Sequence, residues 1–259
     1  MKKSKIIDLV ILLVYPTIGA LLCPLLKINA FGSVIIFFGL PSIYLTIRNI
    51  GYAKKSIIFS LMSSVPSIII IDYISHLTGQ WLIPNSILPY RLFTFVSIEV
   101  ILWAILNVYF VVMFYEYFLN QHLIKKVWQP NMKYLTGIVS LLLVIFVAIY
   151  NFIPQYLNIP YFYLCFGLVL LLIPLSFHFF KHPKFILKFF KIAAYFFYLT
   201  LLYEITALQL GWWAFPGKQF LGWVYISNIR FPIEELVFWL SLFAMAILAY
   251  YEFFDDDEK

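Results

Sequence analysis

Two adjacent carboxylates open the last long apolar run of this chain, within Phe231-Pro232-Ile233-Glu234-Glu235-Leu236-Val237-Phe238-Trp239. A carboxylate at bilayer depth costs about 2.5–3.5 kcal/mol on insertion scales, so it usually serves a function there. On a helix, Phe238 shares a face with Glu234, and Trp239 shares a face with Glu235. A carboxylic acid among apolar rings can stay protonated, and aromatic faces stabilise a cation. The residues predict protonation of an apolar substrate that becomes a carbocation.

A similar set of residues occurs 132 to 136 positions earlier in the chain. In matched order the phrases are Asp72-Tyr73-Ile74 with Glu204-Ile205-Thr206, Gly79-Gln80-Trp81 with Gly211-Trp212-Trp213, Ser97-Ile98-Glu99-Val100 with Pro232-Ile233-Glu234-Glu235, and Phe114-Tyr115-Glu116 with Tyr250-Tyr251-Glu252. Constant order and nearly constant offset predict an internal duplication. The acids of both halves should then converge at one depth, near the extracytoplasmic side: Asp72, Glu99, Glu204, Glu234 and Glu235.

The composition requires a membrane protein to position these acids. The chain of 259 residues is 64% hydrophobic and 12% charged, more apolar than a soluble core needs. Apolar runs long enough to span a bilayer are 6–26, 30–47, 56–75, 91–119, 135–153, 160–180, 185–207 and 230–253. We expect an all-α, polytopic membrane helix bundle of about eight transmembrane helices in two tandem parallel repeats.

The predicted boundaries are a first repeat over 1–120, a cytoplasmic linker over 121–134, a second repeat over 135–254 and an acidic tail over 255–259. The overlong run 91–119 should tilt or begin in the interface. Of the eighteen Lys and Arg residues, all but Lys27, Arg91, Lys218 and Arg230 fall on the side of the termini. The positive-inside rule therefore predicts two cytoplasmic termini in the cell membrane.

The sequence lacks the residues that several classes of protein function require. The ten glycines form no nucleotide-binding loop, and the four histidines make no His-Glu-x-x-His pair. Two cysteines, both in apolar runs, do not support a disulfide framework or a zinc site. We expect no cofactor and no metal. The net charge of +6 follows from the loop bias, so it indicates no nucleic-acid partner.

The chain resembles the lycopene cyclase domain family, flavin-independent membrane enzymes found as two small subunits or as a fused pair. The resemblance is carried by acid-Ile-x5-Gly-x-Trp at the end of the penultimate helix and by Pro-x-Glu-Glu at the start of the last one. It extends from about Tyr161 to Phe254, and more loosely from about Phe31 to Phe118. It implies a carotenoid-synthesis isomerase, or intramolecular lyase, that converts lycopene end groups to β-rings by protonation, ring closure and deprotonation.

The first repeat departs from the family pattern, with Ser97 in place of Pro and Val100 in place of the second acid. We therefore expect the second repeat to carry the acid chemistry. The predicted catalytic residues are Glu234, Glu235 and Glu99, with one of the adjacent pair as proton donor and a second carboxylate as acceptor. The predicted substrate-binding residues are Asp72, Glu204, Trp81, Trp213, Pro232, Phe238 and Trp239.

Other functions fit parts of the same pattern. The chain is alternatively a non-catalytic carotenoid-binding or carrier protein, or a cyclase for a longer, C50-type carotenoid. An intramembrane prenyl-protein protease also has a Glu-Glu pair, but it needs later histidines, and none follows His182. The expected partners are a lipid-soluble carotenoid, membrane lipids and other enzymes of the carotenoid pathway.

Overall fold

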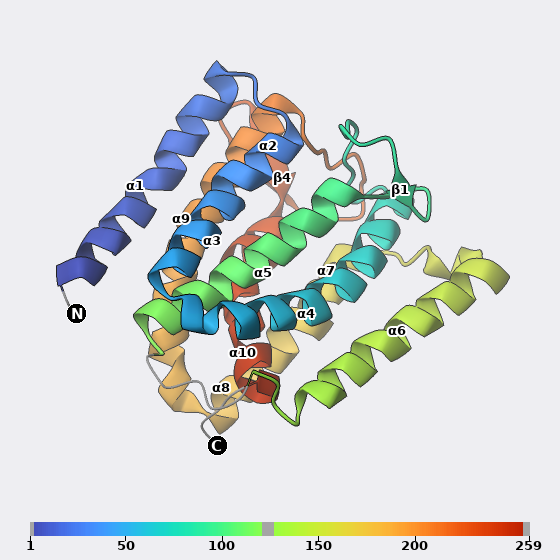
Figure 1. The fold of residues 1–259 in the computed structure, drawn as a ribbon. Coiled ribbons are helices and arrows are strands. Elements are labelled where there is room, and N and C mark those ends of the chain that lie inside the picture. Colours follow the sequence, from blue (N-terminus) through green and yellow to red (C-terminus); the bar gives the residue numbers. More distant parts are fainter. Residues whose placement is uncertain (1–2, 121–126, 256–259) are drawn as a thin grey trace.

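The computed structural model describes residues 3–120 and 127–255. Within them, eight helical stretches are long and apolar enough to cross a membrane, which confirms the predicted polytopic helix bundle. The first stretch begins and the last one ends at the same end of the bundle (Figure 1). Residues 121–126 of the predicted linker and 256–259 of the predicted tail lie outside the described residues.

Four of the eight spans consist of two or three successive helices of different type. In chain order the helices are α1 (Lys3–Leu25), α2 (Ala30–Val34), the π-helix η1 (Ile35–Gly39), α3 (Leu40–Arg48), α4 (Ile50–Leu77), α5 (Ile98–Phe118), α6 (Met132–Phe152), the 3₁₀-helix η2 (Pro154–Leu157), α7 (Phe162–Phe166), the π-helix η3 (Gly167–Leu172), α8 (Ile173–Lys181), the 3₁₀-helix η4 (Pro183–Phe185), α9 (Ile186–Leu210), the π-helix η5 (Glu235–Leu242) and α10 (Phe243–Asp255).

The two π-helices η1 and η3 interrupt their spans at matched places in the two halves of the chain. A π-turn widens the helix by one residue and is rare outside functional or packing sites. Pro41 and Pro174 follow as the second residues of α3 and α8. Because proline cannot donate the helical N–H, a rearranged turn before each proline accommodates its ring.

Two short hairpins replace the predicted starts of the fourth and eighth spans. β1 (Arg91–Leu92) pairs with β2 (Val96–Ser97), and β3 (Trp223–Ile226) pairs with β4 (Ile229–Pro232), both antiparallel. The fourth span therefore begins at Ile98 rather than at residue 91. Ser97 supplies the helix start, since its Oγ accepts the Val100 N–H at 3.2 Å. The prediction of a span over 91–119 was wrong at its start, over 91–97.

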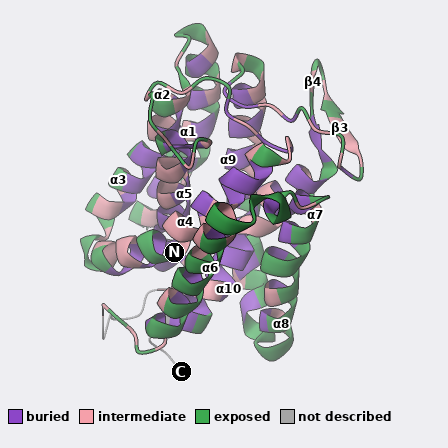
Figure 2. Ribbon diagram, turned by 90° about the vertical axis from the view of Figure 1, so that its right-hand side faces the viewer, coloured by how far each residue is buried: buried purple, intermediate pink, exposed green. Residues whose placement is uncertain are grey.

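The spans pack in matched pairs around two central helices. α1 lies against α9, and α6 lies against α4. Because α1 corresponds to α6 and α4 corresponds to α9, the first span of each half packs against the third span of the other half. α5 and α10 contact each other in the centre, and α5 packs along α4 as α10 packs along α9. Figure 2 shows α6 as a largely exposed helix at the front, with buried segments behind it. The bundle thus surrounds α5 and α10, and α6 borders the lipid.

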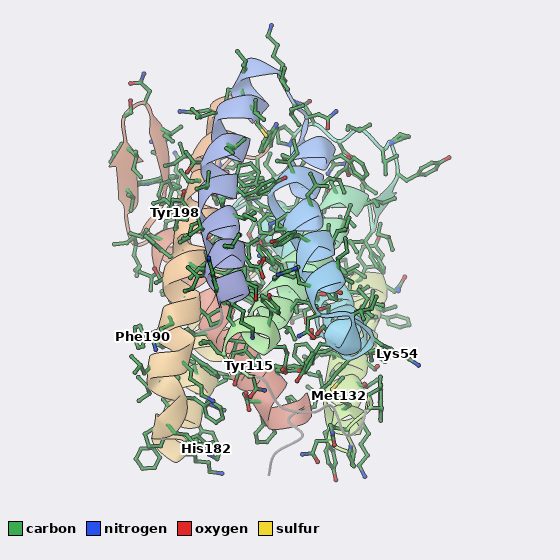
Figure 3. All side chains as sticks on the ribbon, turned by 60° about the vertical axis from the view of Figure 1, so that its left-hand side comes forward. Lys54, Tyr115, Met132, His182, Phe190 and Tyr198 are labelled. Atoms are coloured by element: carbon green, nitrogen blue, oxygen red, sulfur yellow. The ribbon has the colours of Figure 1, made fainter. Side chains whose placement is uncertain are left out.

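Contacts between the halves are reciprocal at the end that carries the termini. The Tyr115 hydroxyl donates to Glu252, and the Tyr251 hydroxyl donates to Glu116 at 2.6 Å. Tyr115 matches Tyr251 in the repeat, as Glu116 matches Glu252, and the two tyrosine rings contact each other at 6.4 Å. Figure 3 shows Tyr115 in the lower part of the bundle, between the helices that carry Phe190 and Met132.

The opposite end shows the same reciprocity. Leu82 and Ala214, at matched positions of the two halves, exchange two backbone hydrogen bonds at 3.1 and 3.0 Å. The indoles of Trp81 and Trp213, also a matched pair, contact each other at 6.2 Å. Self-matching contacts of this kind are what a twofold axis through the bundle produces. The repeat boundaries 1–120 and 135–254 stay predictions.

Candidate active site

A buried cavity of about 40 Å³ lies between α5, α9, η5 and the loop ends beside them. Its walls combine two carboxyl groups, an amide, two phenols and four indoles. They are formed by Trp81, Trp103, Asn107, Tyr163, Thr200, Tyr203, Glu204, Trp213, Glu235, Trp239, Leu240 and Phe243. The volume holds only a few water-sized groups. We refer to this space as the acid cavity.

Glu204 enters the acid cavity from the end of α9, and the turn after that helix fixes its partner. Gly211 takes a left-handed conformation (φ +66°), so the chain reverses and the Trp212 N–H bonds the Ala207 carbonyl at 2.9 Å. This reversal brings the Trp213 Nε1–H back to Glu204 Oε1, at 3.1 Å. The spacing between the acid and Gly-x-Trp therefore brings an indole N–H donor within hydrogen-bonding distance of the acid.

Glu235 enters the same cavity from the first turn of η5. In this π-helix the turn is widened, so Trp239 and Leu240, four and five residues later, both share its face. The Tyr163 hydroxyl faces the Glu235 carboxyl group, and the charge of Glu204 is close enough to interact with it. Glu235 is 7% exposed and Glu204 is 3% exposed, so both acids are removed from solvent.

Glu99 and Glu234, at matched positions, have a different setting. Glu99 accepts the Ser86 hydroxyl at 2.7 Å and the Ile87 and Leu88 N–H groups at 2.8 and 3.3 Å. Glu234 accepts the Leu221 N–H at 2.6 Å. Both side chains are buried and bind the loop that precedes their own helix. The structure therefore places these two predicted catalytic residues outside the lining of the acid cavity and in contact with loop backbone.

The predicted substrate-binding residues divide in the same way. Four of them line the acid cavity: Trp81, Glu204, Trp213 and Trp239. Three do not. Asp72 is buried near Arg91 and the Ser97 backbone, and Pro232 is the buried last residue of β4, paired with Trp223. Phe238 lies over Gly167 on the other side of η5.

Sequence reasoning missed seven cavity residues: Trp103, Asn107, Tyr163, Thr200, Tyr203, Leu240 and Phe243. Two of them carried a signal. Trp103 precedes Trp239 by the same offset that relates the two halves, so the repeat comparison could have paired them, and their rings contact each other at 6.1 Å. Asn107 is a buried amide within an apolar helix, which is unusual enough to flag. Tyr163 is brought in by the fold alone.

A second, apolar cavity of about 190 Å³ adjoins the first. It runs between α4, α5, α6, η3 and α10, and it shares the rings of Trp103, Trp239 and Phe243 with the acid cavity. Its other wall residues are Phe59, Ser63, Ser64, Ser67, Ile68, Ile71, Ala104, Val108, Leu135, Ile138, Val139, Leu142, Phe166, Leu170, Leu171, Ile247, Tyr250 and Phe254. We refer to it as the apolar groove.

A further buried polar cluster lies at the end that carries the termini. Asp8 accepts hydrogen bonds from Tyr44, Tyr117 and Arg48, and the Arg48 contact is an ion pair of 2.9 Å. Glu116 and Glu252 are buried nearby on α5 and α10. This half of the bundle therefore also contains buried acids. Its acids pair with tyrosines and an arginine, an arrangement that satisfies buried charge.

Within residues 3–120 and 127–255, no group of three or more His, Cys, Asp or Glu side chains is arranged to hold a metal ion. Comparisons with protein-family models, with curated proteins and with solved structures each find no match to this chain. The function must therefore be inferred from the site itself. Two close carboxyl groups in an aromatic cavity can give a proton to an apolar substrate and take one back, and the neighbouring groove can hold its chain.

Proposed function

We propose that this protein is a membrane isomerase that cyclises the linear end group of a carotene such as lycopene to a β-ring, as the resemblance implies. The observation that carries the proposal is the pair of buried acids, Glu204 and Glu235, beside an apolar groove. Four indoles surround the acids, and aromatic faces stabilise a nearby carbocation by about 0.5–2 kcal/mol each. A soluble substrate would not need such walls.

The proposed reaction begins with Glu235 giving its proton to the terminal double bond of the end group. The neighbouring double bond attacks the resulting cation, and a new carbon–carbon bond closes the ring. Glu204 then takes a proton from the carbon beside the new cation, which leaves the ring double bond. One proton enters and one leaves, so the formula is unchanged and neither an oxidant nor a reductant is needed.

The different contacts of the two acids support this division of roles. The Trp213 N–H at 3.1 Å stabilises a carboxylate at Glu204, which suits a proton acceptor. Glu235 faces the Tyr163 hydroxyl, which can accept a hydrogen bond from a protonated carboxyl group as well as donate one, whereas an indole N–H only donates. Glu235 Oε2 makes no hydrogen bond with the described residues, and aromatic walls surround it. Because the two carboxyl groups interact, the accepted proton can return to Glu235 between turnovers. Water would capture the cation, and the burial of both acids protects it.

The acid cavity is too small for an end group as it stands, so the proposal requires the shared rings to move. The indole N–H groups of Trp103 and Trp239 make no hydrogen bonds with the described residues. No polar contact of these groups therefore opposes rotation of the two rings. Their rotation would join the acid cavity to the apolar groove, where the substrate chain lies.

The experiment is glutamine substitution in lycopene-accumulating cells, with pigments separated by chromatography. Glu235→Gln and Glu204→Gln should each lower ring formation by about 10²–10⁴-fold, the range of general acid–base catalysis. Glu234→Gln and Glu99→Gln keep a polar loop contact and should lose much less. Equal amounts of protein in the membrane must be shown by immunoblot. Full turnover by Glu235→Gln would overturn the assignment.

A carrier function has less support from the structure. The polar cluster near the termini and the acid cavity are separated by apolar, buried side chains on both central helices, such as Val111, Val112 and Leu248. A coupled carrier needs a polar path between such sites. For the membrane itself, we propose the cell membrane with cytoplasmic termini, on the loop charges and on the shared end of α1 and α10 (Figure 1).

A further inference from the structure

The apolar groove is open toward the lipid on one side. Ile138 and Leu142 on α6 and Leu170 on η3 belong to its wall and are 51%, 45% and 38% exposed. At its inner end the wall consists of the rings that border the acid cavity. A long apolar molecule could therefore enter from the bilayer and reach the acids without crossing water.

Small residues on α4 create the space in this groove. Ser63, Ser64 and Ser67 line it, and each hydroxyl donates to a carbonyl of its own helix, to Phe59, Ser60 and Ser63 respectively. Because these hydroxyl groups already donate to backbone carbonyls, the serines line the groove with small side chains that need no polar ligand as a hydrogen-bond acceptor. Small residues at such positions leave room between membrane helices.

In the second repeat, the positions that correspond to these three serines carry larger side chains. At the offset that pairs Trp81 with Trp213, Ser63, Ser64 and Ser67 correspond to three larger residues of α9. These are Tyr195, Phe196 and Leu199, all buried.

Two of these larger side chains pack against the central helix α5. The Tyr195 ring stacks on Phe114 at 4.5 Å, and the Phe196 ring contacts Phe110 at 5.1 Å. In the described part of the chain, the side of the bundle related to the groove by the internal symmetry is thus a packed aromatic core.

We propose that the apolar groove holds the conjugated chain of a linear carotenoid, and that the protein takes one end group per binding event. This rests on the proposed function. The groove leads to Glu204 and Glu235, the two cavity acids of the second repeat. Among the described residues, Tyr195 and Phe196 fill the equivalent route from the other side. A substrate with two identical ends must therefore leave and rebind in the opposite direction before its second end can be closed.

Filling the groove tests where the chain lies. Ser64→Phe puts into the groove the residue that stands at the matched position, and Leu61→Phe puts the same ring on an exposed position of the same helix. Both changes are made in Glu235→Gln protein, and the lycopene that copurifies from lycopene-accumulating cells is measured by absorbance. We expect Ser64→Phe to lose at least tenfold of the bound pigment and Leu61→Phe to keep it. Equal retention would overturn the groove assignment.

A second variant guards against misfolding, because Ser67→Leu adds less volume and should reduce pigment retention by a smaller factor. The thermal unfolding of each variant in detergent is compared with that of Leu61→Phe. The proposed function fails separately. If Glu235→Gln binds lycopene in the groove while the wild-type protein forms no ring, the binding site stands and the cyclase is refuted. If Ser64→Phe made alone, with Glu235 intact, still forms rings at the wild-type rate, the cyclase stands and the groove is refuted.

The inference that the protein closes one end group per binding event is tested separately, with the wild-type protein. A pulse of labelled lycopene is followed by a large excess of unlabelled lycopene, and labelled products are separated by chromatography. Release after one closure predicts that labelled monocyclic product persists and that labelled bicyclic product stops forming after the chase. Continued conversion of the labelled monocyclic product to the bicyclic product, unaffected by the chase, would overturn it.

Discussion

Gly167 is the point at which η3 and η5 meet, and a single methyl group there should disturb the site. A Cβ built on Gly167 would lie 2.1, 2.2 and 2.5 Å from three ring atoms of Phe238, whereas ordinary contacts begin at 3.4 Å. Phe238 lies between Glu235 and Trp239 along η5, so a shift of the η5 backbone away from the added methyl group would displace residues of the acid cavity. Gly167→Ala is therefore a test of how this packing positions the proposed proton donor.

The size of the effect follows from two opposing terms. Overpacking a buried contact costs about 1–3 kcal/mol, and three ring atoms this close place the cost in the upper part of that range. Alanine is favoured over glycine in a helix by about 1 kcal/mol, which offsets part of it. The net expectation is a loss of about 1–2 kcal/mol in the free energy of unfolding, roughly 5- to 30-fold in the folding equilibrium.

The assay is thermal unfolding in detergent, followed by tryptophan fluorescence, with ring formation in cells as a second readout. Gly137→Ala on α6 is the matched control, since a Cβ there meets no atom within 4 Å. Phe238→Leu in the Gly167→Ala background should recover at least about 1 kcal/mol relative to additivity, because it removes the clashing ring. If Gly167→Ala unfolds like Gly137→Ala, the contact between η3 and η5 is not as described.

Three further predictions concern the supports of the site. Tyr251→Phe removes a donor from the buried Glu116 and should cost about 1–3 kcal/mol in thermal unfolding; an unchanged melting temperature would contradict the reciprocal Tyr–Glu contacts. Gly211→Ala forces a side chain into φ +66° at a cost of about 1–2 kcal/mol, and ring formation should fall with stability; a neutral change would refute the role of this turn. Arg230→Ala removes the contact of the guanidinium with the Trp223 ring at 4.5 Å, so the free energy of unfolding should change by about 1 kcal/mol or less; a larger loss would show that this ring contact is not the main interaction of the side chain.

Much of the architecture was readable from hydropathy. All eight predicted spans correspond to helices, and their positions follow from apolar runs that must satisfy every backbone group internally. The two hairpins were not readable in this way. Residues 91–97 and 229–232 are apolar enough to continue a span, but Ser97 caps a helix that begins after the first of these segments. Hydropathy measures how apolar a segment is and not where its backbone turns.

The sequence identified the buried acids as a set, but it did not distinguish the role of each acid in the site. The repeat pattern identified the five acids Asp72, Glu99, Glu204, Glu234 and Glu235 together. The adjacent pair, Glu234 and Glu235, became the leading catalytic candidates because the first repeat has Val100 in place of the second acid. The separating feature is three-dimensional. The loops before α5 and η5 fold back onto Glu99 and Glu234, whereas the glycine turn after α9 directs an indole onto Glu204. The π-helix that presents Glu235 with Trp239 and Leu240 also has no signature in hydropathy.

The most direct measurement is the pigment profile of lycopene-accumulating cells that express the wild-type protein or Glu235→Gln at equal membrane levels. The proposed cyclase predicts monocyclic or bicyclic product with the wild type, with the monocyclic species appearing first, and unchanged lycopene with the variant. Unchanged lycopene in both, with wild-type protein present in the membrane, would contradict the proposed reaction. Pigment held by the purified protein would then identify a carotenoid-binding protein.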